Sequence, residues 1–154
     1  MTPTVRSHVD HRERCAVITT DFDHPLDVVW TLFSDPAKLA RWWGPPGVPM
    51  TVDHHDLRPG GTVAITVTHD DAVIHGRWTI QRVDAPHHLE FTFESDGLEP
   101  TRISVALAAA TDTSATMSIT ARFATDELLQ HALDIGFAEG VARSCRTAIE
   151  ALDA

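Results

Sequence analysis

Hydrophobic and polar residues alternate along most of the chain between residues 15 and 123, and this alternation predicts a series of strands. The stretch 15–22 predicts a first strand, and 50–57 a second. Five more strands are expected where apolar residues recur at every second position: Val63, Ile65 and Val67; Ile74, Gly76, Trp78 and Ile80; Leu89, Phe91 and Phe93; Ile103, Val105 and Leu107; and Met117, Ile119, Ala121 and Phe123. Such alternation is typical of an antiparallel sheet that buries one face.

Three other segments show helical spacing. The first two are short, at about 25–33 and 36–43, and the run 44–47 (Gly-Pro-Pro-Gly) ends the second. The third, from Asp126 to about Leu152, predicts one long helix that Thr125 or Asp126 can cap. The apolar stripe of this long helix needs a partner, and the sheet is the available one.

Two glycines, Gly136 and Gly140, lie four residues apart inside this long predicted helix. A glycine inside a helix costs about 1 kcal/mol relative to alanine, so each needs a reason. Close approach to the sheet, or room for a ligand, would supply one.

The order of elements predicts an α+β fold: one strand, two short helices, six more strands and one long helix. A curved antiparallel sheet that wraps around this helix can leave a cavity between them. Residues 1–13 are polar and show no periodicity, which predicts a flexible arm ahead of a single domain at 14–154.

Composition narrows the classes of partner. The 154 residues are 43% hydrophobic and carry a formal net charge of −10, which argues against nucleic acid and anionic membrane surfaces as partners. The N-terminal residues lack the apolar stretch of a signal peptide, and no apolar run is long enough to span a bilayer. Cys15 and Cys145 are expected to be reduced and buried, so a cytoplasmic location is predicted.

Ten histidines raise the question of a metal site. The adjacent pairs His54-His55 and His87-His88 would point to opposite faces of their strands, so neither pair can clasp one ion. Spacings typical of zinc ligands and glycine loops that hold phosphate are both missing from the sequence. The sequence therefore predicts neither a metal nor a cofactor.

His54 and Asp56 form the one pair that suggests catalysis. They are two residues apart on a predicted strand, so they are expected to share the covered face with Met50 and Val52. There Asp56 could orient the imidazole of His54 as a general base. In the other interpretation Asp56 binds backbone N–H groups at the following turn or pairs with Arg58.

Several motifs, taken in order, resemble one known family. They are the residues from Phe22 to Pro25, Val29-Trp30, Asp35-Pro36, Arg41-Trp42-Trp43-Gly44-Pro45, Asp56-Leu57-Arg58-Pro59-Gly60-Gly61, Gly76 with Trp78, Pro86 to Phe91, and Gly136 with Ala138-Glu139-Gly140. Together they resemble the AHSA1-like branch (activator of Hsp90 ATPase homologue) of the START/Bet v 1-like (SRPBCC) helix-grip superfamily. The chain departs from this pattern at Val141, where an aromatic residue is usual, and at Cys145, where leucine is usual.

The resemblance implies a helix-grip fold with a cavity for a small hydrophobic or amphipathic ligand between the last helix and the sheet. The expected ligand-binding residues are Trp42, Trp43, Met50, His54, Asp56, Trp78, Phe91, Phe137, Gly140 and Val141. The three tryptophans among them are equally well interpreted as core. Two alternatives are an enzyme of cyclase or hydrolase type that uses His54 and Asp56, and a domain that binds protein partners. For the latter, the resemblance implies an Hsp90-type chaperone as partner by analogy alone. Separately, the resemblance makes a homodimer an expectation.

Overall fold

The computed structural model describes residues 3–44, 47–96 and 99–153. Within these ranges the chain forms eight strands and four helices: β1 (Thr4–Asp10), β2 (Cys15–Phe22), α1 (Leu26–Ser34), α2 (Pro36–Trp42), β3 (Met50–His55), β4 (Thr62–His69), β5 (Ala72–Asp84), β6 (His88–Ser95), β7 (Thr101–Thr111), β8 (Ser114–Arg122), α3 (Asp126–Asp134) and α4 (Phe137–Asp153). All strands join one antiparallel sheet in the order β1-β2-β8-β7-β6-β5-β4-β3. This is the predicted α+β helix-grip fold, with eight strands in place of about seven.

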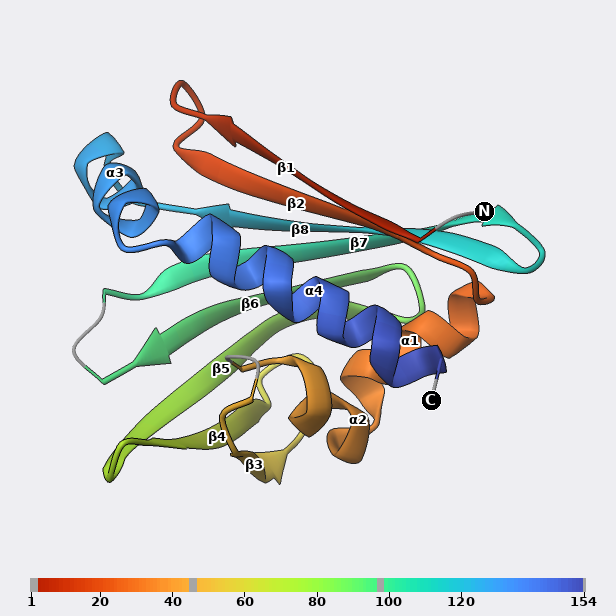
Figure 1. The fold of residues 1–154 in the computed structure, drawn as a ribbon, viewed down its shortest axis with the longest axis horizontal. Coiled ribbons are helices and arrows are strands. Elements are labelled where there is room, and N and C mark those ends of the chain that lie inside the picture. The colour runs from red at the N-terminus through yellow and green to blue at the C-terminus, as the bar shows by residue number, and fades with distance from the viewer. Residues whose placement is uncertain (1–2, 45–46, 97–98, 154) are drawn as a thin grey trace.

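Helix α4 lies across one face of the sheet, with α3 beyond one of its ends and α1 and α2 at the other (Figure 1). The alternation of β4 to β8 places the apolar residues on this covered face, where Leu89, Val105 and Met117 are fully buried. The main core therefore lies between the sheet and the helices.

The N-terminal segment differs from the prediction. Residues 4–10 are not a flexible arm but form β1, which pairs with β2 along its whole length. Val5 and Val9 pack against the core, while Ser7 occupies the position between them on the same face. This polar residue interrupts the alternation, and the sequence pattern therefore missed the strand.

The predicted single C-terminal helix is also wrong, because the helix is interrupted between α3 and α4. Gly136 has a φ of +85°, a left-handed conformation that glycine adopts without steric cost and that commonly ends a helix. Ile135 closes α3 by donating its N–H to His131 O at 3.1 Å. Gly136 is thus the end signal of one helix, whereas Gly140 lies inside the next.

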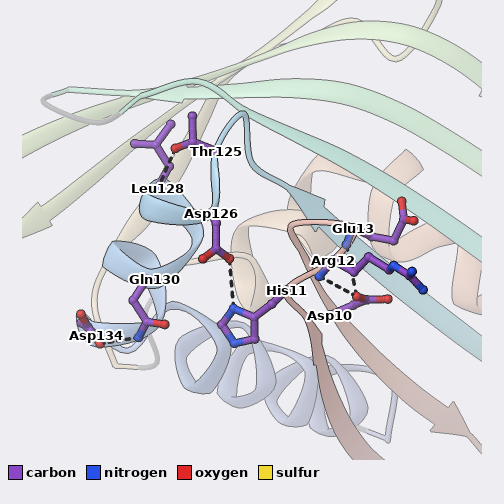
Figure 2. A network of polar contacts seen from close by, with 9 residues as sticks. All are labelled: Asp10, His11, Arg12, Glu13, Thr125, Asp126, Leu128, Gln130 and Asp134. Carbon is purple, nitrogen blue, oxygen red and sulfur yellow. Dashed lines mark hydrogen bonds and ion pairs between the residues drawn. The ribbon is translucent and has the colours of Figure 1, made fainter.

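One polar contact joins the start of α3 to the first hairpin (Figure 2). Thr125 caps α3 by accepting the Leu128 N–H at 3.1 Å, so of the two predicted caps the structure uses this one. His11, in the turn between β1 and β2, contacts Asp126 with 3.1 Å between Nδ1 and Oδ1.

At the other end of the C-terminal segment, His24 Nε2 lies 2.8 Å from Asp153 Oδ1. Contacts to the N-terminal third of the chain therefore connect the start of α3 and the end of α4 to the rest of the fold, while Cys145 and Ala148 anchor α4 in the core.

Candidate functional site

An apolar groove lies between the C-terminal end of α2, strand β6 and helix α4. Its volume is about 350 Å³. It is lined by Trp42, Trp43, Gly44, Phe93, Phe137, Gly140, Val141, Arg143 and Ser144. Aromatic and aliphatic side chains form most of the walls, and Arg143 is the one charged residue in this set. Such a lining suits an apolar molecule.

Two adjacent tryptophans at the end of α2 form one wall. Asp35 caps α2 by accepting the Ala37 N–H at 2.9 Å, and Pro36 occupies the first turn. Trp42 is 1% exposed, and its indole N–H donates to Leu32 O at 2.9 Å, which fixes the ring against α1. Pro45 and Pro46, which were expected to help end this helix, lie outside the described residues.

Trp43 separates the groove from the core behind it. Its ring is half-buried and packs edge-on against Trp42 at 5.3 Å and Trp78 at 4.8 Å between centroids. Trp78 in turn stacks on Phe91 at 4.0 Å, and both are buried. Neither Trp78 nor Phe91 lines the groove, so these two predicted site residues are core side chains in this structure.

The opposite wall comes from α4. Phe137, Gly140, Val141 and Ser144 follow the spacing that brings residues to one helix face. The Phe137 ring packs edge-on against Phe123 at 5.6 Å. Ser144 donates its hydroxyl to Gly44 O at 3.1 Å, and this bond holds the helix wall to the loop that follows the tryptophans.

Gly140 faces open space. A Cβ placed on this glycine would meet no atom within 4 Å, so close packing does not require glycine here. A glycine in a helix interior still costs about 1 kcal/mol relative to alanine. What the missing side chain does provide is free volume in the groove.

The structure does not bring His54 into the groove. Residues Val52 and His54 pair with Ile65 and Ala64 on β4, which leaves Asp53 as an extra residue in a β-bulge. A one-residue shift exchanges the two faces of a strand, so His54 is exposed and His55 takes the inward position. The predicted shared face for Met50, Val52 and His54 is therefore wrong.

The proposed partner of His54 is engaged elsewhere. Asp56 forms an ion pair with Arg58 at 2.9 Å, which was the structural interpretation of this carboxylate. The inward His55 contacts Phe33 O at 2.8 Å through Nε2. No general-base pair of His54 and Asp56 is thus assembled in the groove.

Met50 lies beside the groove rather than in it. It lines a second hollow of about 470 Å³ that shares Gly44 with the groove and is bounded by α2 and the C-terminal half of α4. Its Sδ atom comes within 3.1 Å of where a Gly44 Cβ would be, so the two hollows meet closely at this loop.

The described residues offer neither a reactive thiol nor a cluster of metal ligands. Burial raises the pKa of the Cys145 thiol to about 11, so this thiol stays protonated and poorly nucleophilic near neutral pH. Among the residues described, no three His, Cys, Asp or Glu side chains gather closely enough to hold a metal ion. None of the described helices is both long and apolar enough to span a membrane.

Sequence reasoning missed four lining residues. Phe93 continues the alternation of Phe91 on β6, and Arg143 and Ser144 lie three and four residues after Gly140, so their spacing could have pointed to them. Gly44 directly follows the predicted Trp43, and the Ser144 hydroxyl bond to its carbonyl holds it beside α4.

Comparison with known families assigns the chain. The model of the family described as Activator of Hsp90 ATPase homolog 1-like protein (AHSA1) matches residues 23–152. The chain belongs to this family. The AHSA1 match begins after β2, and it includes both walls of the groove.

Solved structures of similar proteins extend the likeness beyond residues 23–152 to nearly the full length of the chain. A crystal structure of a protein from Mycobacterium smegmatis is 29% identical with a TM-score of 0.84, covering 97% of this chain and 96% of that one. A solution structure of a protein from Arthrobacter aurescens is also 29% identical with a TM-score of 0.90, covering 96% and 91%. Comparison with the curated proteins found no match.

Proposed function

We propose that this AHSA1-family protein binds a small hydrophobic or amphipathic molecule in the groove between α4 and the sheet. Proteins of this fold family generally bind hydrophobic ligands. The groove's volume of about 350 Å³ lies within the range of ligand pockets, about 300–1,000 Å³. Its lining, aromatic and aliphatic with one charged group, has the composition of such pockets.

Gly140 is the observation that carries the proposal. It is the fourth residue of α4, where alanine is a better helix former than glycine, and no neighbouring atom excludes a larger residue. The best explanation for glycine here is that it leaves space free between Phe137, Val141 and the two tryptophans at the end of α2. A protein with no use for this space would gain stability from alanine or leucine at this position.

The test fills the groove from the helix side. Gly140→Leu should weaken binding of the neutral fluorescent probe N-phenyl-1-naphthylamine by tenfold or more, because the leucine occupies the volume that the probe needs. Gly140→Ala is the matched control: it improves the helix in the same way but adds only a methyl group, so binding should fall far less. Leucine and alanine are both good helix formers, so both variants should stay folded.

Fluorescence titration gives the affinity, and thermal unfolding gives the stability of each variant. Ligand that binds the native state alone raises the unfolding temperature, and a screen of fatty acids, sterols and aromatic compounds would narrow the class. Wild-type protein that does not bind the probe or any screened compound, or a Gly140→Leu variant that binds like the wild type, would rule out the groove as the site.

A further inference from the structure

Arg143 places a positive charge at an otherwise apolar groove. It is exposed, and its neighbours in the lining are aromatic, aliphatic or small. Within the described ranges of the chain, its guanidinium group forms no hydrogen bond or ion pair; the Thr147 hydroxyl donates to its backbone carbonyl at 3.1 Å. Its five N–H donors therefore face water when the groove is empty.

The other polar side chains of the groove are partly committed to the protein. The Trp42 indole N–H donates to Leu32 O, and the Ser144 hydroxyl donates to Gly44 O. Arg143 is the charged donor in this lining, and its guanidinium group is not committed to the described protein. A ligand that offers a hydrogen-bond acceptor beside Arg143 would therefore suit the groove.

The charges around Arg143 permit an anion to bind. Glu139, one turn earlier on α4, is exposed and forms no ion pair with Arg143 in this structure. The net charge of −10 opposes anions at long range, but ionic strength of about 0.15 M screens exposed charges beyond about 8 Å. A carboxylate beside Arg143 would therefore experience mainly the guanidinium group, which matches its planar geometry.

We infer that the groove binds an amphipathic carboxylate, with its apolar body between the aromatic walls and its carboxylate at Arg143. This inference rests on the proposed function and narrows it to a class of ligand. The carboxylate would accept a charge-assisted hydrogen bond that a neutral ligand of the same shape cannot form.

The test compares two ligands of matched shape, 1-naphthylacetate and 1-naphthylacetamide, by displacement of N-phenyl-1-naphthylamine. The wild type should prefer the acetate about tenfold, the scale of one hydrogen bond to a charged group. Arg143→Gln should remove this preference by weakening the acetate while leaving the acetamide unchanged. Raising the salt concentration should likewise weaken only the acetate.

Arg146→Gln is the matched control. Arg146 lies on the same helix, is exposed, and is absent from the groove lining, so this variant changes the net charge equally without touching the groove. It should keep the preference for the acetate.

Each other outcome overturns the inference. Equal loss of acetate binding in both variants would mean that only overall charge matters. Equal affinity of the wild type for both ligands would reject the carboxylate while the groove remains a binding site. No binding of the neutral probe to the wild type would instead reject the proposed function itself, and the carboxylate with it.

Discussion

Aromatic residues lie on both sides of the Trp43 ring, but one side is tightly packed and the other is open. Behind the ring, Trp78 and Phe91 are stacked at 4.0 Å and fully enclosed. In front of it, Phe93 and Phe137 leave a groove of about 350 Å³. Aromatic content does not explain the difference, because both sides are rich in it.

The backbone opposite each side explains the contrast better. Behind Trp43 lie β5 and β6, whose neighbouring strands bring large side chains close together. In front lies α4, which contributes Gly140 to the lining, and a Cβ at this position would meet no atom within 4 Å. The aromatic cluster is therefore closed where two paired strands meet and open where it faces a helix with a glycine in its wall.

Truncating one aromatic residue on each side should give the largest effect. Trp78→Ala should lower the free energy of unfolding by about 3–5 kcal/mol, since a fully buried ring leaves a cavity. Phe137→Ala should lower it by about 1–2 kcal/mol, because part of this ring is already exposed. Urea denaturation measures both. Equal losses would contradict the distinction between a packed and an open side.

The two helix glycines should respond in opposite directions. Gly136→Ala should destabilise by about 1–2 kcal/mol, because its φ of +85° strains a residue with a Cβ. Gly140→Ala should stabilise by about 1 kcal/mol, since it improves the helix without a clash. Thermal or urea unfolding of both variants provides the measurement. A stabilising Gly136→Ala would argue that the break between α3 and α4 is not fixed by this residue.

The last comparison concerns the outer face of the sheet, at the contact that holds β1 to β2. Hydrogen bonds from Arg6 and then Thr4 lower the pKa of Asp21 to about 2. Because the folded pKa lies below the unfolded value of about 3.9, the stabilisation is complete above that pH and is lost as pH falls through 2.

Asp21→Asn should therefore be less stable than the wild type near pH 7, and the two should converge near pH 2. The variant also controls for the groove, since it changes stability without altering the lining. Probe binding by the folded variant should equal that of the wild type at neutral pH; reduced binding would show that stability alone governs the affinity.

Much of the fold was predictable because periodicity is a local property. Strands β4 to β8 and helices α1 and α2 follow the spacing of their apolar residues. The pattern failed at β1, where Ser7 interrupts the alternation of apolar residues. It also failed at Gly136, where the helical spacing of apolar residues continues although the helix itself is interrupted. In both places the spacing of apolar residues fits more than one structure: a strand or a flexible arm in the first, and one helix or two in the second.

The site was partly predictable for the same reason. Trp42, Trp43, Phe137, Gly140 and Val141 were expected to bind ligand and do line the groove, although ligand binding itself stays a prediction. The inward placement of His54 was wrong, because the bulge at Asp53 exchanges two adjacent histidines. A shift between identical neighbours leaves no trace in a pattern of residue types.

The sequence by itself determined which residues are apolar on which period, and hence the sheet, the short helices and the family. Only the tertiary structure decided that Trp43 divides the aromatic cluster, that His54 points outward, and that Arg143 meets the groove. Periodicity records how each side chain relates to its own backbone. The position of a groove depends instead on how distant elements approach one another, and this follows from packing across the whole molecule.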